Sequence, residues 1–198
     1  LLQSQLDRAE EGNEITTQYA PLQAVLDMVA KVAPSDSAVL ITGESGTGKE
    51  LIAHMLHRLS ERSGPFVDVS CASLSEGMLE SELFGHERGA FSGADERKLG
   101  LMELAAGGTL FLDEISELSL KLQSKLLRAL DQRSFYRVGG TQKVEVDVRI
   151  LAASNRDLVQ RAAETSFRDA LLYRINTIAL KLPPLRQRTV AIPPTARH

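Results

Sequence analysis

Apolar positions repeat along this chain with two different periods. Near its start they recur three and four residues apart, at Leu22, Val25, Leu26, Val29 and Val32, which predicts an amphipathic helix. Short apolar runs of strand length then alternate with further helical patterns. Strands are predicted at 38–42, 66–69, 109–112 and 148–153, and helices at 50–59, 76–83, 118–130 and 167–175.

Strands that alternate with helices predict an α/β fold, with a mainly parallel sheet sandwiched by helices. In such folds the ligand crevice lies at the carboxyl ends of the strands. The length of 198 residues, with 43% hydrophobic and 25% charged residues, suits one globular domain with a sizeable core. Functional side chains are therefore expected just after each predicted strand.

Composition limits the partners and the cellular compartment that we expect for this domain. A net charge of -3 gives no basic field for DNA, so we expect DNA contact only through a domain absent from this chain. Cys71 is the only cysteine, which excludes an intrachain disulfide and a cysteine zinc cluster and fits a reducing cytoplasm. The apolar runs are too short to span a membrane, so we expect a soluble, cytoplasmic protein without membrane contact.

A glycine-rich turn follows the first predicted strand and opens the next helix. Its residues are Gly43, Glu44, Ser45, Gly46, Thr47, Gly48 and Lys49, followed by Glu50. Glycines let successive N–H groups point at phosphate oxygens, and the helix N-terminus and Lys49 add positive potential. The pattern predicts a nucleotide site with Lys49 at the β- and γ-phosphates; the alternative is a turn without a ligand. Glu50 stands where the general motif has a hydroxyl group for Mg²⁺.

Two carboxylates, Asp113 and Glu114, end the strand predicted at 109–112. Adjacent strand residues point to opposite faces, so the two acids can divide the work. We predict that Asp113 holds Mg²⁺ and that Glu114 polarises the water that attacks the γ-phosphate. The alternative is a helix cap, for which Ser116 or Glu117 is also available.

Asn155 follows the strand predicted at 148–153, which places a neutral amide at the same crevice edge. We expect this amide to orient the water or to sense the γ-phosphate, with a plain turn residue as the alternative.

A second glycine-rich segment has no obvious folding role. It contains Gly89, Ala90, Phe91, Ser92, Gly93 and Ala94. Such a loop is expected to be mobile and to bury Phe91 little. An aromatic side chain at a flexible tip indicates a partner surface; the alternative is a Phe91 folded back on its own domain.

These motifs together resemble the AAA+ domain, a P-loop NTPase, of sigma-54-dependent transcription activators, the bacterial enhancer-binding proteins. The likeness runs from about residue 21 to residue 188, and the Phe91 segment is similar to the family loop that contacts sigma-54. It implies an ATPase that uses ATP and Mg²⁺ and assembles as a hexamer or heptamer ring. It also implies remodelling of the sigma-54 RNA polymerase holoenzyme, which activates transcription.

The same resemblance implies arginine fingers and a second pore loop. Residues 167–174 are similar to the finger segment, so Arg168 and Arg174 are expected to reach the γ-phosphate of a neighbouring subunit. Their spacing on a regular helix turns through roughly 240°, so we expect Arg168 to dominate and Arg174 to support it. Solvated surface arginines are the alternative. Residues 135–140 resemble the second pore loop, with a β-hairpin turn as the alternative.

Some positions depart from the family pattern. Ser70 replaces an Asn that couples the catalytic Glu to the sigma-54 loop, and Ser92 replaces a Thr. The end of the chain does not match the small helical lid, which we expect to be missing or truncated. We expect a linker helix at 1–14, an ATPase core at 15–188 and an atypical tail at 189–198, in a fragment of a longer regulator with low ATPase activity.

Two other functions stay open from the sequence. A different AAA+ machine, such as an unfoldase or a magnesium-chelatase-like motor, would share the phosphate loop and the acidic pair, but not the Phe91 segment. A nucleotide-dependent binding module without hydrolysis would fit Ser70 and the missing lid.

Overall fold

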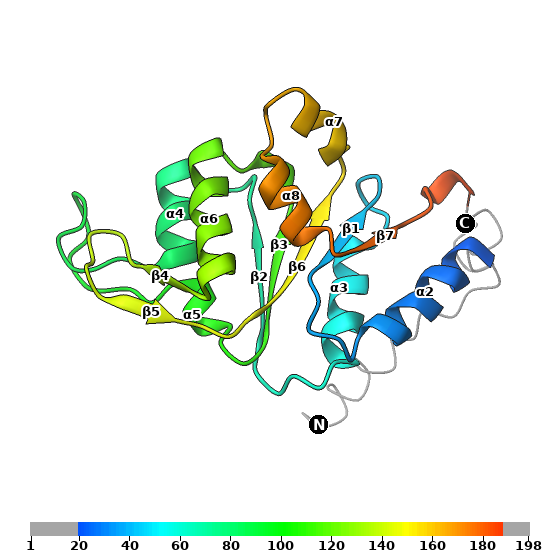
Figure 1. Cartoon of the computed structure of the whole chain (residues 1–198), viewed down its shortest axis with the longest axis horizontal. Helices are drawn as coiled ribbons and strands as arrows, with labels where there is room; N and C mark the ends of the chain where they lie inside the picture. Colours follow the sequence, from blue (N-terminus) through cyan, green and yellow to red (C-terminus); the bar gives the residue numbers. More distant parts are fainter. Residues whose placement is uncertain (1–19, 188–198) are drawn as a thin grey trace, which may run out of the picture.

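A five-stranded parallel sheet forms the centre of the computed structural model, which describes residues 20–187 (Figure 1). The strand order is β2-β3-β6-β1-β7. These strands are β1 (Val39–Thr42), β2 (Phe66–Ser70), β3 (Thr109–Asp113), β6 (Arg149–Ser154) and β7 (Ile178–Lys181). A small antiparallel pair, β4 (Ser134–Tyr136) and β5 (Lys143–Glu145), forms a second sheet. The predicted α/β fold with a mainly parallel sheet is confirmed.

Helices cover both faces of the central sheet (Figure 1). The α-helices are α2 (Ala20–Val32), α3 (Lys49–Arg58), α4 (Glu76–Phe84), α5 (Leu101–Leu104), α6 (Leu120–Gln132), α7 (Leu158–Ala163) and α8 (Asp169–Ile175). Two 3-10 turns complete the described elements, η1 (Ile115–Glu117) and η2 (Leu185–Gln187). Helices α2 and α3 pack on one face, and the others pack on the opposite face.

The strands divide their side chains between two apolar clusters. In β3, Leu110 and Leu112 join the cluster beneath α4 and α6, whereas Phe111 joins the cluster beneath α2 and α3. Successive strand residues point to opposite faces, so both faces of the sheet are apolar. Burial of each large apolar side chain stabilises the fold by about 1.5–3 kcal/mol. The three layers hold the carboxyl ends of the strands, and the loops that follow them, in fixed relative positions.

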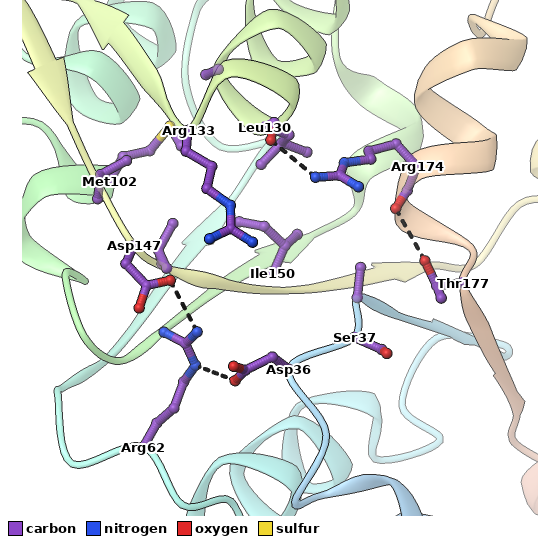
Figure 2. A pocket seen from close by; sticks show the side chains of 14 residues that line it. Asp36, Ser37, Arg62, Met102, Leu130, Arg133, Asp147, Ile150, Arg174 and Thr177 are labelled. Carbon is purple, nitrogen blue, oxygen red and sulfur yellow. Dashed lines mark hydrogen bonds and ion pairs between the residues drawn. The ribbon is translucent and has the colours of Figure 1, made fainter.

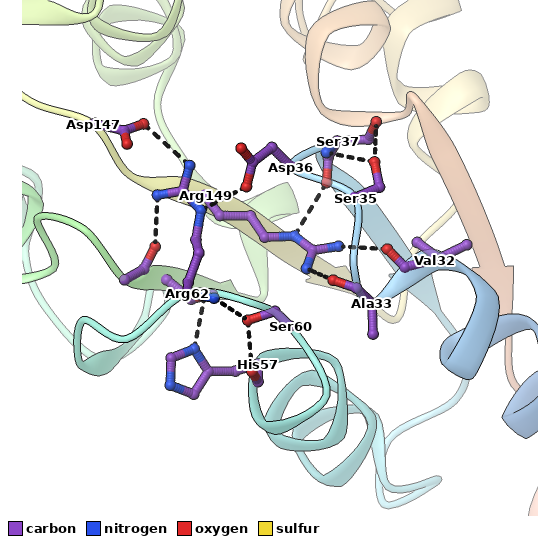
Figure 3. Close-up of polar contacts among 12 residues, drawn as sticks. Val32, Ala33, Ser35, Asp36, Ser37, His57, Ser60, Arg62, Asp147 and Arg149 are labelled. Atoms are coloured by element: carbon purple, nitrogen blue, oxygen red, sulfur yellow. Dashed lines mark hydrogen bonds and ion pairs between the residues drawn. The ribbon is translucent and has the colours of Figure 1, made fainter.

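A buried arginine joins the end of α2 to the sheet (Figure 3). The guanidinium of Arg149 donates to the carbonyl oxygens of Ala33 at 2.6 Å and Val32 at 3.2 Å. These carbonyls lie at the end of α2, where helical partners run out, and Arg149 supplies donors to both; the Val32 carbonyl also accepts from the amide of Ser35 at 3.0 Å. Burial lowers the pKa of Arg149. Nearby, Arg62 binds Asp36 at 2.7 Å and Asp147 at 3.1 Å, and the hydrogen bond from Arg62 lowers the pKa of Asp36.

Several element boundaries differ from the prediction. Helix α6 begins at Leu120 rather than at 118, because the Ser119 hydroxyl accepts a hydrogen bond from the amide of Leu122 as a cap. Helix α8 begins at Asp169 rather than at 167, because Arg168 has an extended backbone. Strand β7 was not predicted, and its four residues are held by pairing with β1. The linker helix predicted at 1–14 and the tail predicted at 189–198 lie outside the described residues.

Candidate active site

The phosphate loop joins β1 to α3 at the carboxyl edge of the sheet. Gly48 precedes the first turn of α3 with φ 91° and ψ 29°, a left-handed conformation that strains residues with a Cβ atom. The first amides of a helix have no partner within it, so the start of α3 offers donors and positive potential to an anion. Gly48 therefore stands at a position of the turn that favours a residue without a Cβ atom.

Lys49 lies back across the loop that precedes it. Its Nζ donates to the carbonyl oxygens of Gly43 and Glu44, both at 3.0 Å. The hydroxyl of Thr47, which is buried, donates to the same Glu44 carbonyl at 2.8 Å. The ammonium thus lies inside the curve of the loop, and phosphate oxygens are stronger acceptors for it than neutral carbonyls.

Both carboxylates of the phosphate-loop region have partners outside the loop. Glu44 pairs with Arg186, whose Nη1 lies 2.6 Å from Oε1. Glu50, in the first turn of α3, lies 3.9 Å from Nε2 of His54 on the next turn. Neither carboxylate is bound to Lys49. Glu44 and Glu50 can therefore offer a phosphate only their backbone N–H groups.

The acidic pair does not divide between two strand faces as predicted. Strand β3 ends at Asp113, and Glu114 has φ 52° and ψ 43°. The left-handed conformation turns the chain into η1, so the alternation of a strand no longer applies at Glu114. Such a backbone costs about 1–3 kcal/mol in a residue other than glycine and is typical of functional turns.

Hydrogen bonds fix both carboxylates of this pair. The amide of Glu114 donates to Oδ1 of Asp113 at 2.9 Å. The hydroxyl of Ser70, at the end of β2, donates to Oε2 of Glu114 at 3.1 Å. The Glu114 side chain is therefore held toward β2, the neighbour of β3 in the sheet.

Helix capping does not account for the acids at this turn. Ser119 caps α6, whereas Ser116 donates to Glu117 at 3.1 Å. Glu117 also pairs with Arg156 at 3.2 Å. Because Arg156 follows Asn155, this pair connects the turn after β3 with the turn after β6.

Asn155 is exposed in the turn after β6, the strand between β3 and β1. The hydroxyl of Ser154 shapes the turn by accepting from the amide of Arg156 at 3.0 Å and donating to its carbonyl at 2.8 Å. Asn155 lines a cavity of about 740 Å³ with Gly43 and Glu44. The structure thus brings Asn155, the phosphate loop and the acidic pair to one edge of the sheet.

The residues at this edge fit Mg²⁺ that shares its ligands with a nucleotide. Within residues 20–187 no group of three or more His, Cys, Asp or Glu side chains could hold a metal by itself. Asp113 supplies a half-buried carboxylate at the strand end. Mg²⁺ commonly takes one or two carboxylates, phosphate oxygens and water, which matches this donor set.

The two candidate finger arginines lie at opposite ends of α6. Nε of Arg168 donates to the carbonyl of Leu120 at 3.2 Å, and Nη2 of Arg174 donates to the carbonyl of Leu130 at 3.1 Å. These carbonyls are about 15 Å apart along the helix axis. Arg168 precedes α8 with an extended backbone, so the argument from the spacing on a regular helix does not apply to this pair. Neither arginine lines the 740 Å³ cavity.

Arg174 instead lines a separate cavity of about 340 Å³ at the amino ends of β1 and β6 (Figure 2). Arg62, Arg133 and Asp147 also line it, whereas the phosphate loop and the acidic pair do not. Arg174 further pairs with Asp131 at 3.5 Å. The contacts of Arg174 in this subunit are thus remote from its own phosphate loop.

The Phe91 segment forms a closed loop with an exposed tip. The amide of Gly89 donates to the carbonyl of Ala94 at 2.8 Å, and the amide of Ala94 donates to the carbonyl of Phe91 at 3.0 Å. The Phe91 side chain is 46% exposed, and its ring meets the His86 ring edge-on at 5.0 Å. Ser92 at the tip is exposed. Phe91 therefore touches its own domain and still offers half of its surface to a partner.

Residues 135–140 belong to the β4–β5 hairpin, which was the alternative considered for them. The hairpin contacts the residues just before the Phe91 segment through Val138, whose carbonyl accepts from the amide of Glu87 at 3.0 Å. Arg137 is buried between Glu103, at 2.8 Å from its Nε, and Glu87, at 2.9 Å from its Nη1. Gly139 packs so tightly on Ala90 that an added Cβ would lie 2.8 Å from the Ala90 Cβ. The two loops thus form one connected unit.

Sequence reasoning missed Arg137, Glu103, Arg156 and Arg186 as members of this region. Their roles depend on contacts between distant parts of the chain, which no local spacing reveals. Arg137 and Glu103 are 34 residues apart, and Arg186 and Glu44 are 142 residues apart.

Comparisons with known proteins identify the family of this chain. The family model of the sigma-54 interaction domain matches residues 15–181 of this chain. The transcriptional regulatory protein FlbD of Caulobacter vibrioides is 54% identical over 168 residues, which cover 84% of this chain and 37% of FlbD. The regulatory protein AtoC of Escherichia coli is 51% identical over 198 residues, which cover 100% of this chain and 43% of AtoC.

Among solved structures, NtrX from Brucella abortus in complex with ATP superposes with a TM-score of 0.83 and 38% identity, over 95% of this chain and 44% of the NtrX chain. The fold is therefore that of a P-loop NTPase domain of the AAA+ type. The chain belongs to the sigma-54 interaction domain family. This membership favours the resemblance to sigma-54 activators over the unfoldase and chelatase-like alternatives. The chain spans less than half the length of the two curated relatives named above.

No helix within residues 20–187 is both long enough and apolar enough to cross a membrane. The cytoplasmic location stays a prediction.

Proposed function

We propose that this domain hydrolyses ATP and uses the reaction to remodel the sigma-54 RNA polymerase holoenzyme, which activates transcription. The observation that carries the proposal is the meeting of three groups at one sheet edge: the phosphate loop, the acidic pair and Asn155. The exposed Phe91 loop supplies a second surface, which suits a partner protein rather than a small substrate.

The chemistry follows from the positions of the side chains. The amides at the start of α3 bind the phosphates, and Lys49 leaves its two carbonyl acceptors for the β- and γ-phosphates. Asp113 would hold Mg²⁺, and the bound ion would neutralise charge on the phosphates. Glu114, oriented by Ser70, accepts a proton from the attacking water, and Asn155 orients that water.

A neighbouring subunit completes the site in our proposal. Arg168 and Arg174 do not line the cavity beside their own phosphate loop, so in this proposal each acts on a nucleotide bound to a second copy. A guanidinium at the γ-phosphate stabilises charge that develops during phosphoryl transfer. We therefore propose a hexamer or heptamer ring in which Arg168 is the dominant finger and Arg174 supports it.

A short stretch of chain can carry the effect of hydrolysis to the partner. Ser70, which binds Glu114, ends β2, and α4 then leads directly to the loop that holds Phe91. A change in the Glu114 contact when ATP becomes ADP would bias two positions of that loop. Ser70 keeps a hydrogen bond to the carboxylate, although its side chain is shorter than Asn.

Other parts of the full-length protein supply the DNA contact in this proposal. The net charge of -3 gives this domain no field that would attract the DNA backbone.

Turnover and binding assays on point variants test the proposal. Glu114→Gln should bind a fluorescent ATP analogue within about twofold of the unchanged chain and should lose about 100-fold or more in turnover, since it removes the base. Lys49→Ala should lose nucleotide binding. Specific activity of the unchanged chain should rise with protein concentration, because the fingers act between subunits. Unchanged turnover in Glu114→Gln would reject the assignment of the base.

A further inference from the structure

Glu44 puts a negative charge into the loop that the proposed function assigns to an anionic ligand. Like charges repel, and the repulsion is stronger near a protein surface than in bulk water. A carboxylate at this position therefore weakens nucleotide binding unless a cation accompanies it. We propose that Arg186 is that cation, and that it sets the nucleotide affinity of the phosphate loop by neutralising Glu44. This inference rests on the proposed function of the loop.

The contact between the two residues is close. Nη1 of Arg186 lies 2.6 Å from Oε1 and 2.7 Å from Oε2 of Glu44, so one guanidinium nitrogen spans both carboxylate oxygens. Lys49 does not replace Arg186 here, because Nζ of Lys49 binds the carbonyl oxygens of Gly43 and Glu44 instead. Without Arg186, the free carboxylate would repel phosphates and would compete with them for the Lys49 ammonium.

The fold brings Arg186 to the loop from the far end of the described chain. The amide of Leu182 donates to the carbonyl of Thr42 at 2.8 Å, which continues the β7–β1 pairing to the start of the loop. Gly43 lies directly against this segment, since an added Cβ would be 3.0 Å from the Cβ of Leu182. The next turn, η2, is closed by the amide of Gln187, which donates to the carbonyl of Pro184 at 3.0 Å. Arg186 is therefore presented by an anchored segment.

Both partners line the cavity that Asn155 and the phosphate loop share. The pair is thus part of the wall of the nucleotide site. Its side chains are 69% exposed for Arg186 and 55% exposed for Glu44, so the pair contributes little to folding. Substitutions there should leave the fold intact, and an effect on nucleotide affinity can be separated from an effect on stability.

Four variants test the inference: Arg186→Ala, Glu44→Gln, the double variant, and Arg128→Ala as a matched control. Arg128 is an exposed arginine of α6 that does not line the nucleotide cavity. Affinity is measured with a fluorescent ATP analogue in about 0.05 M salt, where exposed charges act over a long range. We expect Arg186→Ala to weaken binding about threefold to tenfold, as one unneutralised charge near a polyphosphate does. The double variant should return to within about twofold of the unchanged chain, because Glu44→Gln removes the charge that needed a partner.

Salt dependence and the control variant distinguish an electrostatic effect on nucleotide binding from a structural one. The loss in Arg186→Ala should shrink in about 0.5 M salt, and Arg128→Ala should bind as the unchanged chain does. Unchanged affinity in Arg186→Ala, or a double variant that stays as weak as the single one, would overturn the inference while Lys49-dependent binding still supports the proposed function. Absence of Lys49-dependent binding in the unchanged chain would reject both.

Discussion

The hydroxyl of Ser70 donates a hydrogen bond to Oε2 of Glu114 across 3.1 Å, from the end of β2 to the turn after β3. The two strands pair in parallel, with Ser70 opposite Asp113, so the sheet itself sets the approach of the hydroxyl to the carboxylate. A serine at this position therefore reaches Glu114 without a longer amide side chain. The orientation of the proposed base depends on this one contact from β2.

Ser70→Ala should lower the rate of ATP turnover. A single hydrogen bond contributes about 0.5–1.5 kcal/mol, so we expect a loss of about threefold to tenfold in kcat. Nucleotide affinity should stay within about twofold, because Ser70 does not line the cavity beside the phosphate loop. Steady-state ATPase rates and analogue binding measure the two quantities. A variant with unchanged kcat would show that Ser70 does not orient Glu114.

Arg137→Ala should destabilise the domain. It would leave Glu103 and Glu87 without their shared cation, and the Arg137 side chain is only 5% exposed, so solvent screens the pair little. Removal of one partner of a buried ion pair costs about 3–5 kcal/mol. The melting temperature should fall by about 6–20 °C, because about 1 kcal/mol shifts it by about 2–4 °C in domains of this size. Arg128→Ala, on the exposed face of α6, should change the melting temperature by less than about 2 °C; equal effects would show that the Arg137 ion pairs do not stabilise the domain.

Mixtures of inactive subunits should regain activity if the fingers act between subunits. Arg168→Ala removes the dominant finger, and Lys49→Ala removes nucleotide binding, so each variant alone should be inactive. In a mixture, a Lys49→Ala subunit can supply Arg168 to the intact phosphate loop of its neighbour. We expect ATP turnover well above the sum of the separate variants, measured over a range of mixing ratios. No recovery at any ratio counts against fingers in trans.

Cys71 should be unreactive in the folded protein. Burial raises the pKa of its thiol to about 12, and the neighbouring carboxylates of Asp113, Glu114 and Glu117 add to the shift. The folded-state pKa lies above the usual value, so the thiol stays protonated as the pH rises through 8. A chromogenic disulfide reagent at pH 8 should react slowly with the native chain and rapidly in urea. Fast reaction with the native chain would show that the thiol is accessible or ionised.

The sequence predicted those parts of the site that depend on local spacing. Lys49 and its glycines follow an apolar strand, and Asp113 ends another, so a single window of sequence identifies each of them. Strand alternation also predicted the parallel sheet, whose two apolar clusters take alternate residues of β3. The order of these elements was enough to place the crevice at the carboxyl edge.

Other features could not be read from local patterns. Strand β7 is short, and pairing with β1 holds it in the sheet. The left-handed backbone at Glu114 ends the strand geometry there, so the side chains of Asp113 and Glu114 do not alternate between two strand faces as predicted. Arg137 and Arg186 resemble surface arginines in sequence, yet each binds carboxylates far away along the chain. These contacts form only in the tertiary fold, so no short stretch of the sequence reveals them.

Capture of purified sigma-54 in the presence of ADP and aluminium fluoride, a mimic of the transition state, tests whether the bound nucleotide controls the Phe91 surface. The unchanged chain should retain sigma-54 with the mimic and release it with ADP alone. Phe91→Ala should lose at least about tenfold in capture while ATP binding is unchanged, because a central aromatic contact often dominates an interface. Leu59→Ala, which truncates an equally exposed apolar side chain at the end of α3, should capture sigma-54 normally. Equal capture by Phe91→Ala, or capture that does not depend on the nucleotide, would contradict a nucleotide-controlled sigma-54 contact at Phe91.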